Sequence, residues 1–173
     1  MQLAFIHART PGSIDATLRD VAAELVRQGR RLAGVVQEPV ATGARHRCDM
    51  ELIELASGWR LPVSQTLGAG STGCRLDGVA ITAVAAMVEA DLASRGADLL
   101  ILNRFGKIEA AGRGFRPLIA SALQRGIPVL VGVNDLNRPA FDAFAADLAV
   151  ELPDLPAAVL GWAAPILRRA AAA

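Results

Sequence analysis

Hydrophobic positions along the chain follow two alternating patterns. Short apolar runs predict strands, and the run 98–103 is apolar almost throughout, as in a strand buried on both faces. Between the runs, apolar residues recur about every three or four positions, which is typical of helices packed on a sheet. The predicted strands are 3–7, 32–36, 98–103 and 127–133, with an edge strand at 148–151. The predicted helices are 14–28, 79–95, 115–125, 138–145 and 156–169, the last containing Pro165, which is expected to kink it.

Residues 40–77 depart from this alternation. Residues 48–55 alternate between polar and apolar side chains, Ser57 and Gly58 form a turn signal, and 61–67 reads as a second extended segment. This pattern predicts a β-hairpin inserted between α/β units. A glycine-rich loop, 68–77, follows it, and Asp77 is placed to begin the next helix.

Strands that alternate with helices predict an α/β fold with a mainly parallel sheet. In such sheets ligands bind beyond the carboxyl ends of the strands. Those ends fall at 7–13, 103–109 and 134–135. We therefore expect any functional site to draw its residues from these three segments.

Composition narrows the function classes. The 173 residues fit one domain, 1–173, and 53% apolar content supplies a large core. A net charge of +1 and 4% aromatic residues argue against nucleic-acid binding. No membrane-spanning run or signal peptide is expected, and Cys48 and Cys74 lack a metal or redox spacing. We expect a cytoplasmic protein, with a homo-oligomer left open.

The segment His7–Asp15 lies between the first strand and the first helix, where nucleotide-binding proteins carry a phosphate-binding loop. It contains Gly12 and Ser13, but no lysine and no G-x-x-x-x-G-K-[ST] pattern. A helix N-terminus at this place still favours an anion through its backbone N–H groups and its dipole. His7 and His46 have no partner at metal-ligand spacing, so no metal site is predicted from them.

Two segments carry a resemblance to the small P-loop nucleoside-triphosphatases first described in thermophiles. Leu99–Glu109 is similar to their I-D-E-I-G-K-M-E strand and loop, and Ala33–Glu38 with the hairpin is similar to their G-F-x-T-x-E strand and its hairpin. The resemblance implies a three-layer P-loop-like fold. The magnesium-binding Asp and the catalytic Glu of that family fall on Asn103 and Arg104. An arginine is no general base at neutral pH and an amide is no full-charge metal ligand, so efficient triphosphate hydrolysis is not expected.

A second resemblance covers nearly the whole chain. Gly70–Asp77 is similar to a G-S-x-x-C-R-L-D loop, and Asn103–Phe115 to an N-R-F-G-K-x-E-x-x-G-R-G-F segment, of an uncharacterised bacterial domain family. Members of that family are often encoded beside molybdate ABC transporters. The resemblance implies no established activity. It favours molybdate as a ligand, and a molybdate transporter or molybdenum-cofactor proteins as partners.

From these observations we predict a degenerate P-loop domain that binds a small oxyanion such as molybdate, or the phosphate of a nucleotide. No metal site and no catalytic residue are assigned. Charge-assisted donors suffice for such a pocket. The candidate ligand-binding residues are Arg9, Thr10, Gly12, Ser13, Ser71, Arg75, Asn103, Arg104 and Lys107.

Structural roles compete with each assignment. Asn103 could cap a turn at the end of a strand. Arg104 could form an ion pair with Glu109 or with a surface acid, and Arg75 could form an ion pair with Asp77. Two other functions stay open. One is a nucleotide phosphatase with a relocated metal site at Glu38, Glu109 or Asp135. The other is a protein-interaction module that uses the hairpin or the C-terminal helix.

Overall fold

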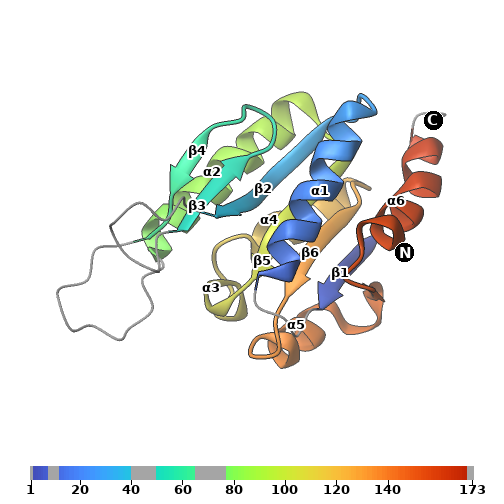
Figure 1. The fold of residues 1–173 in the computed structure, drawn as a ribbon. Helices are drawn as coiled ribbons and strands as arrows, with labels where there is room; N and C mark the ends of the chain where they lie inside the picture. Colours follow the sequence, from blue (N-terminus) through green and yellow to red (C-terminus); the bar gives the residue numbers. More distant parts are fainter. Residues whose placement is uncertain (1, 8–11, 40–49, 65–76, 171–173) are drawn as a thin grey trace.

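A computed structural model describes residues 2–7, 12–39, 50–64 and 77–170. Its centre is a seven-stranded sheet with the order β4-β3-β2-β5-β6-β1-β7 (Figure 1). The strands are β1 (Leu3–His7), β2 (Leu32–Pro39), β3 (Met50–Glu54), β4 (Arg60–Pro62), β5 (Leu99–Phe105), β6 (Val129–Val133) and β7 (Ala149–Leu152).

The sheet is parallel except at one edge. β3 pairs antiparallel with both β2 and β4, whereas β1, β2, β5, β6 and β7 are joined by parallel pairs. The predicted hairpin is therefore confirmed as an addition to the parallel sheet, and β7 forms the opposite edge, as expected. Sequential strands β1 and β2 are separated in space by β5 and β6.

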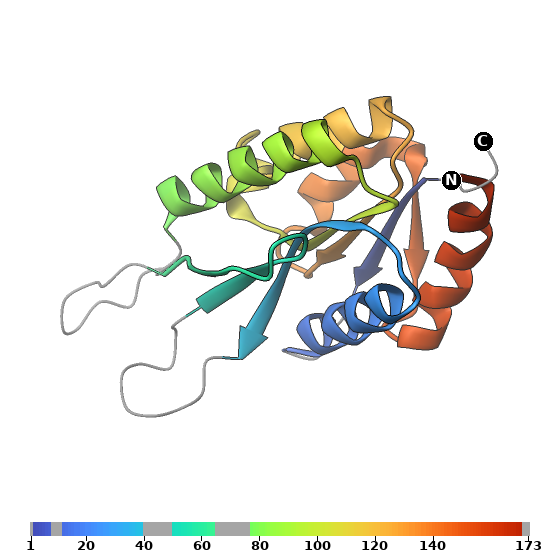
Figure 2. The same ribbon diagram turned by 90° about the horizontal axis from the view of Figure 1, so that it is seen from above.

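Helices cover both faces of the sheet. The helices are α1 (Ser13–Arg27), α2 (Gly78–Arg95), α3 (Lys107–Ala110), α4 (Arg116–Gln124), α5 (Arg138–Ala145) and α6 (Pro156–Ala170), with a 3₁₀ turn, η1 (Ala146–Leu148). α1 and α6 lie on one face, and α2, α4 and α5 lie on the other (Figures 1 and 2). The predicted three-layer α/β fold is confirmed. No helix in the described residues has the length and apolar character needed to cross a membrane.

Burial explains why these segments form these elements. The first four residues of β5, Leu99–Leu102, are completely buried between the helical layers, as their unbroken apolar run predicts. α1 buries the stripe Ile14, Leu18, Val21 and Leu25 against the sheet. Asp77 begins α2: its Oδ1 accepts hydrogen bonds from the N–H groups of Val79 and Ala80 at 2.8 and 3.2 Å.

Short elements and strand ends differ from the sequence expectations. β2 runs to Pro39 and β5 to Phe105, so Arg104 lies within the strand rather than after it, and Asn103 is not its last residue. α3 and η1 were not expected, because four and three residues are too few to show a helical period. Glu54 is 3% exposed, since its carboxylate accepts hydrogen bonds from Ala56 and Ser57 in the hairpin turn. The helix continues through Pro165.

Candidate functional site

The carboxyl ends of the parallel strands converge where α1 begins. In Figure 1 the arrowheads of β1 and β6 point to the edge at which α1 starts and near which α3 and α5 lie. This edge gathers His7 at the end of β1, Asn103 and Arg104 near the end of β5, and Ser13 at the start of α1. The structure thus places the described candidate residues in the region that the sequence predicted.

Asn103 connects three elements. Its Oδ1 accepts a hydrogen bond from the N–H of Gln37 on β2 at 3.0 Å. Its Nδ2 donates to Gln37 Oε1 and to Asp15 Oδ1, both at 3.2 Å. The residue is 4% exposed, so its amide is committed to joining β2, β5 and α1.

Arg104 forms an ion pair with the first turn of α1. Its NH2 group lies 2.9 Å from Asp15 Oδ1, and the side chains of Arg104 and Asp15 are 36% and 13% exposed. The sequence alternative of a pair with Glu109 is wrong. Arg104 Nε is buried and has no acceptor in the described part of the chain. The guanidinium is therefore held beside the helix N-terminus, on a side chain that is partly exposed.

The N-terminus of α1 provides the second component of the site. Gly12 precedes the helix with φ of 81°, a left-handed conformation that glycine adopts without strain. Its carbonyl accepts the hydrogen bond from Ala16 N–H at 3.2 Å and so begins the helix. The N–H groups of the first turn point to the same edge as Arg104, where the helix dipole adds positive potential.

Lys107 and Glu109 both lie in α3 and behave differently. Lys107 is exposed and makes no polar side-chain contact within the described residues. Glu109 is 3% exposed: its Oε2 accepts from Gly106 N–H at 2.9 Å and its Oε1 from Phe115 N–H at 3.1 Å. The Asn103–Phe115 motif thus contains a carboxylate that organises the turn between α3 and α4.

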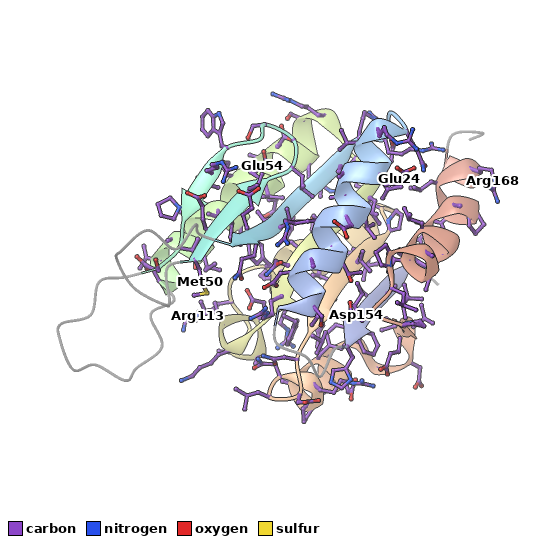
Figure 3. The ribbon with its side chains drawn as sticks, viewed as in Figure 1. Glu24, Met50, Glu54, Arg113, Asp154 and Arg168 are labelled. Carbon is purple, nitrogen blue, oxygen red and sulfur yellow. The ribbon has the colours of Figure 1, made fainter. Side chains whose placement is uncertain are left out.

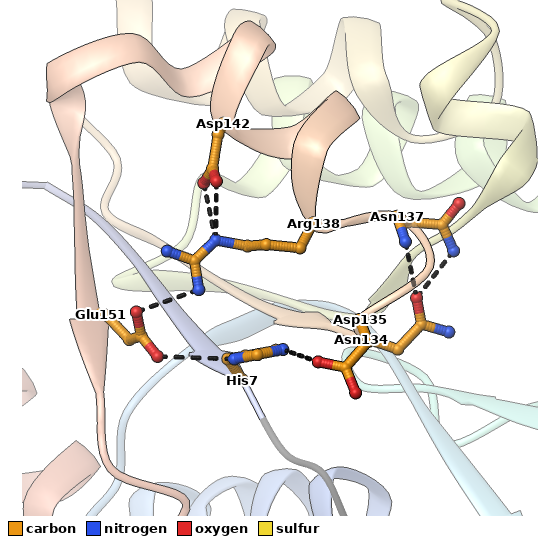
Figure 4. A network of polar contacts seen from close by, with 7 residues as sticks. All are labelled: His7, Asn134, Asp135, Asn137, Arg138, Asp142 and Glu151. Atoms are coloured by element: carbon orange, nitrogen blue, oxygen red, sulfur yellow. Dashed lines mark hydrogen bonds and ion pairs between the residues drawn. The ribbon is translucent and has the colours of Figure 1, made fainter.

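A second polar network lies at the same end of β1 (Figure 4). His7 Nε2 is 2.7 Å from Asp135 Oδ1, and His7 Nδ1 is 3.6 Å from Glu151 Oε1. Arg138 donates to Glu151 at 3.0 Å and to Asp142 at 2.7 and 2.9 Å, and its guanidinium lies 4.6 Å from the centre of the Phe5 ring. The hydrogen bond to Asp142, helped by Glu151, raises the pKa of Arg138 above its ordinary value.

Sequence reasoning treated His7 as isolated, and the structure corrects this. Asp135 is 128 positions away along the chain, so no local spacing reveals the contact. The available signal was that His7 ends β1 and Asp135 follows the end of β6 by two residues, and that β1 and β6 are parallel neighbours in the sheet.

The three carboxylates proposed for a relocated metal site are engaged separately. Glu38 pairs with Arg60 of the hairpin, Asp135 with His7, and Glu109 with two backbone N–H groups. Within the described residues, no group of three or more His, Cys, Asp and Glu side chains is arranged to hold a metal ion.

Several predicted residues fall outside the described residues. They are Arg9, Thr10, Ser71 and Arg75 from the candidate site, together with His46, Cys48 and Cys74. Their assignments stay predictions.

Comparison with known protein families identifies the family of this chain. A family described as "Protein of unknown function (DUF2478)" matches residues 3–162. The chain belongs to this family. The match spans every strand of the sheet and most of the helices, α6 being covered in part.

Two curated proteins are similar to this DUF2478 chain over part of their length. One is "Molybdenum import ATP-binding protein ModC 2" of Bradyrhizobium diazoefficiens, 35% identical over 151 residues, which are 87% of this chain and 17% of that protein. The other is "Homocitrate synthase" of Frankia alni, 39% identical over 93 residues, which are 52% of this chain and 26% of that protein. The chain therefore spans about a sixth and a quarter of the curated relatives it matches.

Two solved structures share the fold. THEP1 from the hyperthermophile Aquifex aeolicus superposes with a TM-score of 0.64 at 18% identity, covering 90% of this chain and 91% of that one. A human cancer-related nucleoside triphosphatase superposes with a TM-score of 0.58 at 22% identity, covering 78% and 76%. The fold of this DUF2478 chain is that of the small P-loop nucleoside-triphosphatases, as the sequence resemblance implied.

Proposed function

We propose that this protein binds a small oxyanion, free or as part of a nucleotide, at the N-terminus of α1 beside Arg104, and does not cleave it. The observation that carries the proposal is the position of Arg104, 2.9 Å from Asp15 in the first turn of α1. A permanent cation there adds to the partial positive charge of the helix terminus.

The surroundings of Arg104 support the choice of an anion. The Asp15 carboxylate contacts one guanidinium nitrogen of Arg104, and the Arg104 side chain as a whole is 36% exposed. Lys107 lies three residues further along the chain and is exposed. Arg9, Thr10, Gly12 and Ser13 complete the proposed pocket, with Ser71 and Arg75 contributed by the glycine-rich loop.

The surroundings of Asn103 support binding without catalysis. A P-loop triphosphatase needs a carboxylate to hold its magnesium ion and a group to activate water. Asn103 occupies the position implied for the first role, and its amide is engaged by Gln37 and Asp15. Arg104 occupies the position implied for the group that activates water. It is a cation paired with Asp15, so it can attract an anion but cannot act as a base.

Molybdate is our preferred ligand, with a nucleotide phosphate as the other member of the same chemical class. The preference rests on the similarity to a protein named as a molybdenum-import ATP-binding protein. We accordingly propose that the chain is a single domain that acts in the cytoplasm. Its proposed partners are a molybdate transporter or molybdenum-cofactor proteins. Neither partner is needed for the binding test below.

Isothermal titration of the purified protein with molybdate, tungstate, sulfate, ATP and GTP tests the proposal. We expect saturable binding of at least one of them without added magnesium. No heat of binding with any of them at millimolar concentration would contradict the proposal and favour the protein-interaction module. Magnesium-dependent release of phosphate from ATP or GTP would instead support the phosphatase.

Two variants with opposite expected effects locate the site. Arg104→Gln removes the cation and is expected to weaken binding roughly tenfold, as for a lost charge-assisted contact. Asp15→Asn removes the competing carboxylate, leaves Arg104 to the ligand, and is expected to strengthen binding severalfold. Arg125→Gln, an exposed arginine after α4, is the charge-matched control and is expected to leave affinity unchanged. Equal affinities in all three variants would place the anion elsewhere.

A further inference from the structure

A cavity of about 290 Å³ lies between α1 and α6, away from the candidate anion site. We propose that it binds a small organic monocarboxylate whose body is apolar. The apolar part of its wall is formed by Leu25 of α1 and by Leu160, Ala164 and Leu167 of α6. Its volume is just below the range of about 300–1,000 Å³ for sites that hold drug-sized molecules, which fits a smaller ligand.

Two arginines supply the polar part of the wall, Arg30 before β2 and Arg168 near the end of α6. Arg30 Nε is buried and has no hydrogen-bond partner in the described part of the chain. Arg168 is exposed and likewise has no acidic partner among those residues. Because a guanidinium keeps its charge, two arginines without a carboxylate leave a positive potential at the cavity that an anionic ligand group would neutralise.

Most other arginines of the described chain already have a partner. Arg27, Arg31, Arg60, Arg95, Arg104 and Arg138 all form ion pairs with carboxylates. The acid nearest the cavity along α1, Glu24, is itself engaged by Arg27 and by Gln28, whose side chain also lines the cavity. Two arginines without a carboxylate therefore face one partly apolar cavity. A carboxylate accepts two hydrogen bonds from a guanidinium, and an apolar body fills the leucine-lined remainder.

The cavity is separate from the proposed oxyanion site. Leu25 follows Gly12 by thirteen residues of α1, which is about 20 Å along a helix that rises 1.5 Å per residue. Figure 3 shows Arg168 and Glu24 at one end of the neighbouring helices α6 and α1, and Asp154, just before α6, at the other. The two sites thus lie at opposite ends of α1, the oxyanion site near the carboxyl ends of the parallel strands and the cavity near their amino ends.

Titration followed by ¹H–¹⁵N NMR and calorimetry tests the inference, with phenylacetate and hexanoate as probes and their uncharged amides as controls. We expect the carboxylates to bind saturably and to shift resonances of α6 and of the second half of α1. The amides are expected to bind about tenfold more weakly, because they lack the charge. Equal binding of acid and amide, or no shifts at millimolar concentration, would overturn the inference.

Variants separate the cavity from the oxyanion site. Arg30→Gln is expected to weaken carboxylate binding about tenfold, and Ala164→Leu to abolish it by filling the cavity. Arg125→Gln, on the other face of the sheet, and Arg104→Gln are expected to leave it unchanged. Thermal unfolding of each variant checks that the fold is retained. Carboxylate binding that depends on Arg104 but not on Arg30 would refute this site, and loss of oxyanion binding alone would refute only the function proposed above.

Discussion

The buried carboxylates among the described residues accept hydrogen bonds from backbone groups of nearby turns. Within the described residues, Glu54 and Glu109 are the buried acids, each 3% exposed, and each accepts backbone N–H groups of a nearby turn. A buried charge without such partners is strongly unfavourable, so these hydrogen bonds are what allow an acid at these positions. The acidic residue of the Asn103–Phe115 motif thus has a structural explanation.

Glu109→Gln is expected to lower the free energy of unfolding by about 1–3 kcal/mol, because an amide has a single acceptor oxygen for two N–H groups. Urea denaturation measures the loss. Asp20→Asn, an exposed carboxylate on α1, is the control and is expected to change stability little. An unchanged midpoint for Glu109→Gln would show that the two backbone contacts contribute nothing.

Two glycines of the same motif offer a matched comparison. Gly114 has φ of 58°, and a Cβ there would lie 2.2 Å from Glu109 Oε1. Gly112 has φ of 82° with open space around it. Gly112→Ala is expected to cost about 1–2 kcal/mol from backbone strain alone. Gly114→Ala adds the collision with Glu109 and is expected to cost clearly more, measured by the same denaturation.

If both glycine variants lose the same stability, the close packing of Gly114 on Glu109 is not real. If Gly114→Ala does not fold, Gly114→Ala combined with Glu109→Ala, which removes the colliding carboxylate, serves as the test. The combined variant is then expected to regain part of the stability that the single substitution loses.

At the residue scale, the sequence predicted where the strand-end residues lie in the fold, but not which side chains they contact. The edge-of-sheet location of Asn103 and Arg104 follows from where a buried strand ends. The pairing of Arg104 with Asp15 crosses 89 positions of the chain, and the pairing of His7 with Asp135 crosses 128. Contacts of that separation depend on strand order, which apolar periodicity does not encode.

At the level of elements, long and strongly patterned segments were predictable. α1, α2 and β5 carry an unbroken helical stripe or apolar run, and each lies within two residues of its expected bounds. α3 is too short to show a period, and it forms because Glu109 satisfies the Gly106 N–H. This contact is local, since Glu109 lies three residues after Gly106 and acts as a capping group at the start of the helix.

Helix α2 depends on its N-cap residue, Asp77. Asp77→Ala removes the acceptor for the N–H groups of Val79 and Ala80 and is expected to cost about 1 kcal/mol. Asp77→Asn keeps a capping oxygen and is expected to retain most of the stability. Chemical denaturation of both variants checks this. Equal losses in the two would mean that charge, rather than capping geometry, matters at this position.

The C-terminal part of α1 has a measurable acid–base property. Hydrogen bonds from Arg27 and then Gln28 lower the pKa of Glu24 from 4.5 to about 2. Because the folded pKa is the lower one, the stabilisation is complete above the unfolded value and is lost as pH falls from about 4.5 towards 2. Carboxyl NMR titration of Glu24 checks the value. A midpoint near 4.5 would contradict the contacts with Arg27 and Gln28.

At the scale of the whole molecule, the chain has the fold of the small P-loop nucleoside-triphosphatases. The fold superposes on THEP1 from Aquifex aeolicus across 90% of this chain, which the sequence resemblance predicted. The α/β class followed from alternating patterns, and the antiparallel edge from the hairpin. The network around His7 and the cavity between α1 and α6 were not predictable, because each joins elements from opposite halves of the chain.

A crystal structure of the protein grown with tungstate, with anomalous data collected at the tungsten edge, tests the central claim most directly. The account predicts one strong anomalous peak at the N-terminus of α1, within contact of the Arg104 guanidinium and held without a metal ion. A structure that binds tungstate only elsewhere, or that shows magnesium coordinated at Asn103 when crystallised with a nucleotide, would contradict it.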